Sequence, residues 1–416
     1  MSSNRIVKNE PIRPSVYGIG LYFLVACTDS FPIGTIGSFL KIVVLIPLAL
    51  ALFDLKKLQI RFSALVVVQL LLLFLSVISL FYSINTDRTF VSVRTLILNL
   101  ALVFFFGMME RYNQRELQYM QRALLVSGWV TILMMVLFSS ISSDGRLSLL
   151  LGEGEQDQNY INGYFLYTFS WHSCQLILQK KKLHFIPVII IFTIVLLTGS
   201  RGALLAFILV LFMHMCILFA CSNHKFRNIF MLVLLSVVLL IAFDLILAQM
   251  PDSVAKRFSW DYISATGTTG RTRVWSFLLK QFGESSILRM LFGYGYGTTI
   301  TINTLNGKVA HNLYLEYLLT LGIVGLTLQL LIQILIIRIL LKHRQYPLLG
   351  AYFGMLGMCM SLSILAYKPI WNIMILALAI DFYEKAKSHS GALSRSTTQT
   401  ALYEPGVGSF ENSINI

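Results

Sequence analysis

The sequence predicts an all-α membrane protein with about 12 transmembrane helices and one large, partly helical extracytoplasmic loop. The 416 residues are 56% hydrophobic and only 12% charged, and the mean hydropathy is +0.73. Soluble proteins are about a quarter charged. Apolar segments recur along the whole chain, and the cationic residues gather in alternate loops. These observations exclude a soluble enzyme, a disordered chain and a small disulfide-stabilised domain.

Each predicted helix rests on one apolar segment. A membrane crossing needs about 20 mainly apolar residues, and several of the segments are short or contain Gly and Pro. The twelve segments are residues 16–30, 34–53, 63–82, 93–109, 123–140, 162–178, 185–198, 203–221, 229–247, 311–337, 349–366 and 370–383.

The distribution of Lys and Arg predicts the orientation, because cytoplasmic loops of membrane proteins are enriched in them. With a cytoplasmic N-terminus, 20 of the 33 Lys and Arg residues fall on the inner side and five in short outer loops. Seven lie in one long outer loop, and Lys41 lies within a segment. An even number of crossings then places both termini in the cytoplasm. The formal net charge of +14 is an orientation signal, and no nucleic-acid partner is expected.

We divide the chain into N-terminal transmembrane helices (1–247), a large extracytoplasmic loop (248–310), C-terminal transmembrane helices (311–385) and a disordered cytoplasmic tail (386–416). A structureless loop as long as 248–310 is unusual unless it is functional. Within it, Thr272–Phe282 has the apolar spacing of an amphipathic helix lying on or near the membrane. The glycines of LFGYGYG (291–297) lack the flanking strand of a dinucleotide site and predict a tight turn.

Arg201 is the first of three polar features expected on the outer side. It lies in Gly199-Ser200-Arg201-Gly202, where an apolar helix begins. Helix N-termini attract anions, and a guanidinium forms paired hydrogen bonds with phosphate. The alternative is an arginine that only reaches the membrane interface.

Two further arginines, Arg271 and Arg273, lie in Gly270-Arg271-Thr272-Arg273-Val274-Trp275 at the start of the predicted loop helix. Both could face a diphosphate, and the alternative is a solvated basic turn.

His311 begins the third feature, His311-Asn312-Leu313-Tyr314-Leu315-Glu316. Of the seven histidines, His311 alone is positioned for chemistry on the outer face. Imidazole is a natural general base near neutral pH. Asn312, Tyr314 and Glu316 are possible supporting residues, although Glu316 could equally serve helix packing.

The remaining polar residues predict neither a metal nor a cofactor. The five cysteines lie in or beside apolar stretches without metal-ligand spacing, and the outer face has no paired-carboxylate metal motif. The acidic loop 141–161 is expected to be solvated, with some chance that Asp157 or Asn159 contacts a polar substrate.

Four segments in this order resemble the O-antigen ligase and O-antigen polymerase superfamily: LLTGSRGALLA (196–206), GRTRVW (270–275), LFGYGYG (291–297) and AHNLYLEYLLTLGIVGL (310–326). The resemblance covers about residues 185–330. It implies a GT-C-like integral membrane glycosyltransferase that needs no metal and uses an undecaprenyl-diphosphate-linked glycan as donor. It further implies that Arg201 and Arg271 contact the diphosphate, with Arg273 a weaker candidate, and that His311 activates the acceptor.

The resemblance places the protein in the bacterial cytoplasmic (inner) membrane, in contact with membrane lipid and with its active site on the extracytoplasmic face. The acceptor is either a growing glycan, for a polymerase of surface polysaccharide, or lipid A core, for a ligase; we favour the polymerase slightly. A lipid-linked oligosaccharide flippase or another polytopic transporter is the alternative. A flippase should carry cations deep in several helices, whereas here the arginines gather at the outer surface.

Overall fold

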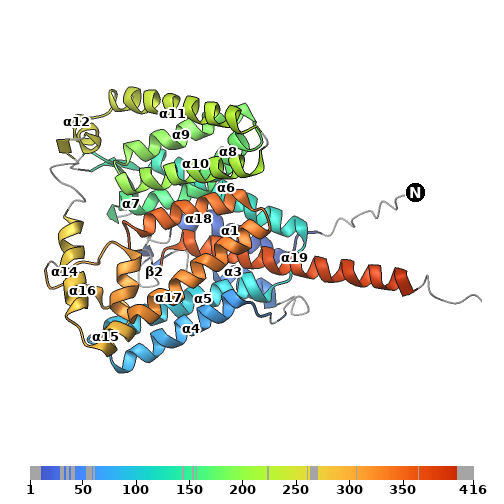
Figure 1. Ribbon diagram of the computed structural model, residues 1–416, viewed down its shortest axis with the longest axis horizontal. Helices are drawn as coiled ribbons and strands as arrows, with labels where there is room; N and C mark the ends of the chain where they lie inside the picture. Colours follow the sequence, from blue (N-terminus) through green and yellow to red (C-terminus); the bar gives the residue numbers. More distant parts are fainter. Residues whose placement is uncertain are drawn as a thin grey trace, which may run out of the picture.

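The computed structural model consists mainly of long helices packed side by side (Figure 1). A large hydrophobic core runs through the bundle, formed by residues from both halves of the chain. The structure describes residues 11–28, 32–33, 37–38, 43–52, 59, 61–142, 145–151, 154–155, 157–222, 224–259, 261–262, 270–305, 307–363 and 365–400.

The first half of the chain consists mainly of helices and also forms two small antiparallel sheets. Its elements are α1 (Pro14–Leu24), η1 (Ala26–Thr28), β1 (Pro32–Ile33), β2 (Gly37–Ser38), α3 (Leu45–Leu52), α4 (Ala64–Ile78), η4 (Ser79–Phe81), α5 (Thr86–Leu102), the π-helical η5 (Val103–Met109), α6 (Gln114–Leu137), β3 (Ser139–Ile141), β4 (Leu147–Leu151), β5 (Gly154–Glu155), α7 (Gln158–Ile161), η6 (Asn162–Phe165) and α8 (Leu166–Ile177). Strand β4 pairs with β3 and β5, so part of the acidic loop that we expected to be simply solvated forms a small sheet.

The second half contains the segments of the candidate site. Its elements are η7 (Lys182–His184), α9 (Phe185–Leu197), α10 (Arg201–Cys221), α11 (Lys225–Leu247), α12 (Asp252–Ala255), η8 (Lys256–Phe258), α14 (Arg271–Gly283), α15 (Ile287–Phe292), α16 (Thr299–Ile302), α17 (Leu313–Lys342), α18 (Tyr346–Cys359) and α19 (Lys368–Thr400). Side chains cap several of these helices, as expected for Ser and Asn at an N-cap. Ser200 caps α10 and Asn312 caps α17.

Each of the twelve predicted apolar segments overlaps a helix. Among the described residues, five helices are long and apolar enough to cross a membrane: Ala64–Phe81, Thr86–Met108, Gln114–Leu137, Arg201–Cys221 and Leu313–Lys342. Shorter apolar helices occur at Pro14–Leu24, Lys182–Leu197 and Tyr346–Cys359. The chain is therefore largely helical with several potential membrane crossings, and a total of 12 remains a prediction.

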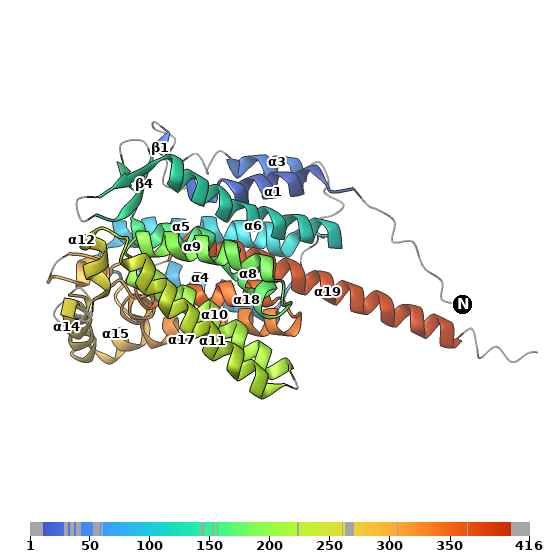
Figure 2. The same cartoon turned by 90° about the horizontal axis from the view of Figure 1, so that it is seen from above.

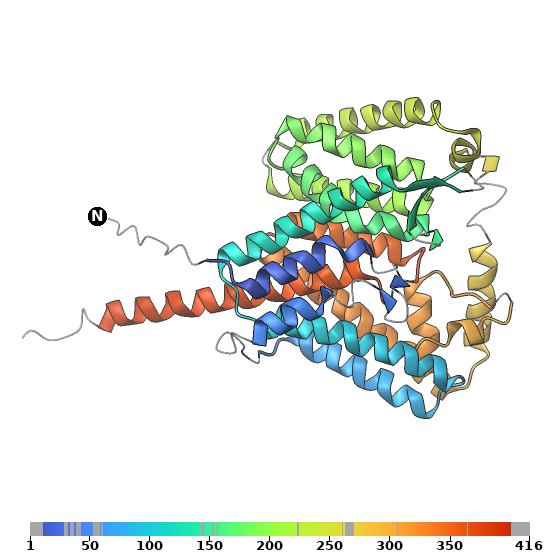
Figure 3. The same cartoon turned by 180° about the vertical axis from the view of Figure 1, so that it is seen from behind.

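The described helices of the predicted outer loop lie at the opposite end of the bundle from the start of α1 and the end of α19 (Figure 1). Helices α14, α15 and α16 gather at one end, and α19 extends away from the other, where α1 begins (Figures 1 and 2). The view from behind shows the strands near the end that carries α14 (Figure 3). This arrangement fits two termini on one side of a membrane and the 248–310 loop on the other.

Helix α14 confirms the helix predicted for Thr272–Phe282 within this loop. It runs from Arg271 to Gly283 and buries Val274 and Leu278. These two side chains are four residues apart and therefore share one face of the helix. They pack with Leu315 and Leu319 of α17 in a small separate hydrophobic cluster. The loop helix is thus attached to the segment that follows His311.

Helix α17 is broken at Gly322, where the backbone leaves the helical region with φ 68°. Leu313 and Ile332 would be about 29 Å apart in a continuous helix, yet both line the same small cavity. The chain therefore bends back on itself at Gly322. We had predicted one straight crossing over 311–337, and only residues 323–342 form a continuous run beyond the break.

The glycine-rich turn 293–297 packs against this break. The amide groups of Tyr294 and Gly295 donate to the carbonyls of Leu319 and Thr320, both at 3.0 Å. A Cβ atom on Gly322 would collide with the Leu291 carbonyl. Gly293, Gly295 and Gly297 all have positive φ, which glycine adopts readily. The glycines thus form a tight turn, as the sequence predicts.

Helix α19 continues to Thr400, beyond the apolar segment and into residues 386–416, which we predicted to be a disordered tail. Residues 401–416 of the predicted disordered tail lie outside the described part of the chain.

Cysteine labelling tests the predicted orientation. In a variant without the five native cysteines, Lys181→Cys, Lys225→Cys and Lys342→Cys should react with a membrane-impermeant maleimide only after the cells are opened. Glu284→Cys and Thr304→Cys, both on exposed residues, should react in intact spheroplasts. The reason is the excess of Lys and Arg in the loops assigned to the cytoplasm. Labelling of Glu284→Cys only from the inside would reverse the whole topology.

Candidate active site

The turn before α10 is fixed by backbone conformation and by two arginines. Gly199 has φ 60°, a left-handed conformation that suits glycine. Arg146 Nε donates to the Thr198 carbonyl at 2.8 Å, and Arg257 Nε donates to the Gly199 carbonyl at 3.2 Å. Arg201 follows as the first residue of α10. The tertiary structure therefore presents Arg201 from a rigid turn.

Arg201 and Arg271 form a pair of partly buried cations, each at the first residue of a helix. Burial lowers the pKa of the Arg271 guanidinium, the carboxylate of Asp157 raises it, and Arg201 lowers it. These effects show that the two guanidinium groups act on each other although 70 residues separate them in the sequence. Both remain protonated, since arginine is not deprotonated in proteins.

Neither arginine of this pair has a carboxylate within 4.0 Å in the part of the chain that the structure describes. Arg201 lies over the Tyr262 ring at 5.9 Å from its centroid, a cation–π contact that leaves its N–H groups available. Partly buried charges normally have partners. Two cations that lack a carboxylate within 4.0 Å are chemically suited to an anionic ligand.

His311, whose imidazole feels the charge of Arg271, is held in an unusual backbone conformation. Its φ is 51°, which is uncommon for a residue with a side chain and costs about 1–2 kcal/mol. The preceding residue is fixed through both of its backbone polar groups: Trp275 Nε1 donates to the Ala310 carbonyl at 2.7 Å, and the Ala310 amide donates to Glu316 Oε1 at 2.8 Å. Helix α14 and helix α17 together impose the orientation of His311.

Glu316 is a buried carboxylate that ties three segments together. Besides Ala310, it accepts hydrogen bonds from Thr299 Oγ1 of α16 and from Ser363 Oγ, both at 2.7 Å. Its side chain is 2% exposed. Three donors around one carboxylate satisfy most of its acceptor sites, so Glu316 supports the His311 segment and does not itself face a substrate.

The electrostatic surroundings of His311 favour the neutral imidazole. Burial lowers the pKa of His311, Arg271 and Lys308 lower it further, and Asp157 opposes them. The Nδ1 atom of His311 is buried and has no hydrogen-bond partner among the described residues. A neutral imidazole next to two cations can accept a proton from a bound hydroxyl group.

The other predicted site residues have structural roles or are exposed. Asn312 caps α17 by accepting from the Leu315 amide at 3.1 Å, and Tyr314 packs against the main hydrophobic core. Arg273 is exposed. Since successive helical residues are separated by about 100°, Arg273 and Arg271 point to different sides of α14. The structure does not bring Arg273 to the arginine pair.

Sequence reasoning missed several residues at this site, chiefly Arg146, Arg257 and the interactions of Asp157. Arg146 is 7% exposed, although we expected it in a solvated acidic loop. A lone arginine among carboxylates is the one signal that could have singled it out. Asp157 precedes a helix of only four residues, which hydropathy does not detect.

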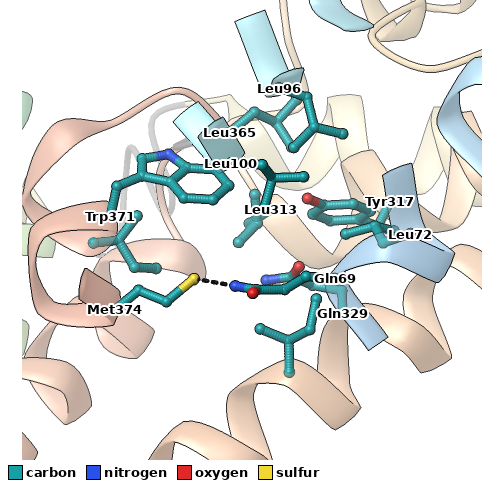
Figure 4. Close-up of a pocket in the computed structure, with 12 residues that line it drawn as sticks. Gln69, Leu72, Leu96, Leu100, Leu313, Tyr317, Gln329, Leu365, Trp371 and Met374 are labelled. Carbon is teal, nitrogen blue, oxygen red and sulfur yellow. Dashed lines mark hydrogen bonds between the residues drawn. The ribbon is translucent and has the colours of Figure 1, made fainter. Parts of the chain in front are cut away.

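The bundle also contains a cavity of about 30 Å³, with room for about two water molecules. Figure 4 shows its mainly apolar lining and the hydrogen bond from the Gln69 amide to Met374 sulfur. A sugar ring is larger than this cavity. The candidate site is therefore the charged surface around Arg201, Arg271 and His311.

The hydrogen bond from Trp275 to Ala310 predicts the effect of a conservative substitution. Trp275→Phe keeps an aromatic ring but removes the N–H donor, which is worth about 1 kcal/mol. We expect turnover to fall severalfold because His311 loses part of its support, while undecaprenyl diphosphate binds as before. Unchanged turnover in Trp275→Phe, measured with the purified protein, would show that this hydrogen bond does not position His311.

Comparison with known proteins gives one family match. Residues 186–330 match the family described as O-antigen ligase, and no curated protein matches the chain. The match confirms the resemblance to the O-antigen ligase and polymerase superfamily. The matched segment includes Arg201, Arg271 and His311 and, together with the apolar helices, indicates a multi-pass membrane protein of the glycosyltransferase type.

Proposed function

We propose that this chain, whose residues 186–330 match the O-antigen ligase family, transfers a glycan from an undecaprenyl-diphosphate donor to a sugar hydroxyl. The reaction takes place at the outer face of the bacterial cytoplasmic membrane, in the synthesis of a surface polysaccharide. The acceptor is a second lipid-linked glycan or lipid A core, and we slightly favour the former. No metal is required.

The observation that carries this proposal is the pair of partly buried arginines without a carboxylate partner, beside a half-buried histidine. The diphosphate of the donor carries negative charge at the membrane surface. Arg201 and Arg271 supply two planar guanidinium groups suited to its oxygens. Each is the first residue of a helix, and in the bound complex their charges stabilise the charge that develops on the leaving diphosphate.

The transfer step follows from these positions. The acceptor hydroxyl oxygen attacks the anomeric carbon of the donor sugar, and the bond from that carbon to the diphosphate oxygen breaks. Undecaprenyl diphosphate leaves with the electron pair. His311 takes the proton of the hydroxyl at a ring nitrogen. The arginines thus bind and stabilise the leaving group, and His311 serves as the base.

Purified protein in lipid nanodiscs tests this proposal. Incubated with an undecaprenyl-diphosphate-linked oligosaccharide, it should release undecaprenyl diphosphate and form longer lipid-linked glycans, or glycan-bearing lipid A core when that acceptor is added. The two products distinguish polymerase from ligase. Absence of undecaprenyl diphosphate release with both acceptors would refute a glycan transferase.

A further inference from the structure

Helix α7 is hydrogen-bonded both to the turn before Arg201 and to the segment that supports His311. On one side, the side-chain oxygen of Asn159 accepts a hydrogen bond from Ser200 Oγ at 2.9 Å, and Ser200 directly precedes Arg201. On the other side, the Tyr160 hydroxyl donates to the Ser363 carbonyl at 3.1 Å. Helix α7 therefore contacts the residue before Arg201 through Asn159, and it contacts the 363 segment through Tyr160.

The contact on the second side leads to His311. Ser363 Oγ donates to Glu316 Oε1 at 2.7 Å, and the same oxygen accepts from the Ala310 amide at 2.8 Å. Ala310 directly precedes His311. Hydrogen bonds thus fix α7 relative to both the cationic residues and the proposed base.

Asp157, the residue before α7, accepts hydrogen bonds from the described residues with one of its two carboxylate oxygens. Its Oδ1 accepts from the backbone amide of Asn159 at 2.7 Å and from its side-chain amide at 2.8 Å. The second oxygen has no hydrogen bond or ion pair among the described residues, and the residue is exposed. Its negative charge nevertheless acts on both Arg271 and His311.

Asp157 is not a permanent partner of Arg271. No ion pair within 4.0 Å joins them, although oppositely charged groups this near would gain from contact. An anionic diphosphate would be repelled by the carboxylate, whereas a sugar hydroxyl can donate a hydrogen bond to it.

We propose that Asp157 binds the acceptor sugar, with its second carboxylate oxygen accepting a hydrogen bond from an acceptor hydroxyl next to the one that reacts. This inference rests on the proposed function. It divides the site into a donor half, formed by Arg201 and Arg271, and an acceptor half, formed by Asp157 and His311. The charged hydrogen bond orients the attacking hydroxyl toward the anomeric carbon and His311.

Asp157→Asn is the informative variant because asparagine is an equally good helix N-cap and keeps the side-chain oxygen that holds Asn159. In nanodiscs with an undecaprenyl-diphosphate-linked oligosaccharide, glycan reaches either an acceptor sugar or water. We expect the ratio of transfer to hydrolysis to fall about tenfold in the variant, as for loss of one charge-assisted hydrogen bond. Asp87→Asn, at another exposed carboxylate in the first turn of an outer helix, should leave the ratio unchanged.

Binding of undecaprenyl diphosphate alone separates this role from a structural one. Removing a negative charge beside the arginines should leave the affinity of Asp157→Asn unchanged or increase it. Reduced affinity, with transfer and hydrolysis falling in parallel, would show that Asp157 only supports the donor site. An unchanged transfer-to-hydrolysis ratio would also overturn the inference. If the unmodified protein neither transfers nor hydrolyses the glycan, the proposed function itself fails.

Discussion

His311→Ala is expected to lower glycan transfer by about 10²–10⁴-fold, the usual contribution of a general base. Donor binding should survive, because it depends on Arg201 and Arg271. The measurement is turnover of lipid-linked glycan in nanodiscs, with the affinity for undecaprenyl diphosphate determined separately. A loss of affinity in proportion to the loss of turnover would make His311 a ligand of the diphosphate.

Two further substitutions at His311 separate proton transfer from folding and from hydrogen bonding. His311→Asn suits the left-handed backbone, since asparagine tolerates positive φ better than most residues. It should therefore fold normally and still be inactive. His311→Gln keeps a hydrogen-bonding group but cannot take up a proton, and it should also be inactive. Substantial activity in His311→Gln would show that the acceptor proton leaves by another route.

The pH dependence of transfer gives an independent test of His311 as the base. Only the neutral imidazole can accept a proton, so the rate should be constant above the pKa of His311 and fall below it. Burial and the neighbouring cations hold this pKa below its ordinary value of 6.5. The acidic decline should therefore lie below pH 6.5, and the reduced rate of His311→Ala should lack it.

Replacing an arginine of the pair should have the second largest effect. Arg271→Ala and Arg201→Ala are each expected to lower transfer by about 10²–10³-fold, as when one preorganised donor to a developing anion is removed. Lysine keeps the charge but lacks the planar pair of donors, so Arg201→Lys and Arg271→Lys should still lose about tenfold or more, or 1.4 kcal/mol. Binding of undecaprenyl diphosphate should weaken in all four variants.

Arg273→Ala is the matched control for this series. Arg273 lies on the same helix as Arg271 but is exposed on another side, and its removal should change donor affinity less than twofold to threefold. Equal losses at Arg271 and Arg273 would mean that the whole basic start of α14 attracts the donor. Full activity of Arg201→Lys and Arg271→Ala would show that these arginines do not bind the donor and only reach the membrane interface.

The sequence alone was sufficient for the features that depend on neighbouring residues. Apolar segments of helical length predicted helices, and each overlaps one in the structure. The apolar spacing of Thr272–Phe282 predicted α14, and the glycines of 291–297 predicted a tight turn. These are local properties, because the backbone period and the conformational freedom of glycine act over a few residues. The ordered motifs also carried the family resemblance that the match of residues 186–330 confirms.

Only the tertiary structure decided which of these residues meet. Asp157, Arg201, Arg271 and His311 are each separated by at least 40 residues in the sequence, and hydropathy contains no information about their distances. Their common site is formed by the Arg146 and Arg257 hydrogen bonds to the 198–199 turn, by α7, and by the support of Ala310 from Trp275 and Glu316.

The break at Gly322 is a second feature that tertiary contacts decided and the local sequence did not predict. Glycine is common in transmembrane helices, so the apolar run predicted one continuous crossing. The left-handed conformation of Gly322 instead depends on contact with the segment around Leu291. The sequence alone predicted a helical membrane protein, with cations and one histidine in the motifs expected on its outer side. Packing between distant segments determined where the helix bends, that Arg273 is exposed, and that the charge of Asp157 acts on Arg271 and His311. Long-range contacts, and not local periodicity, set those positions.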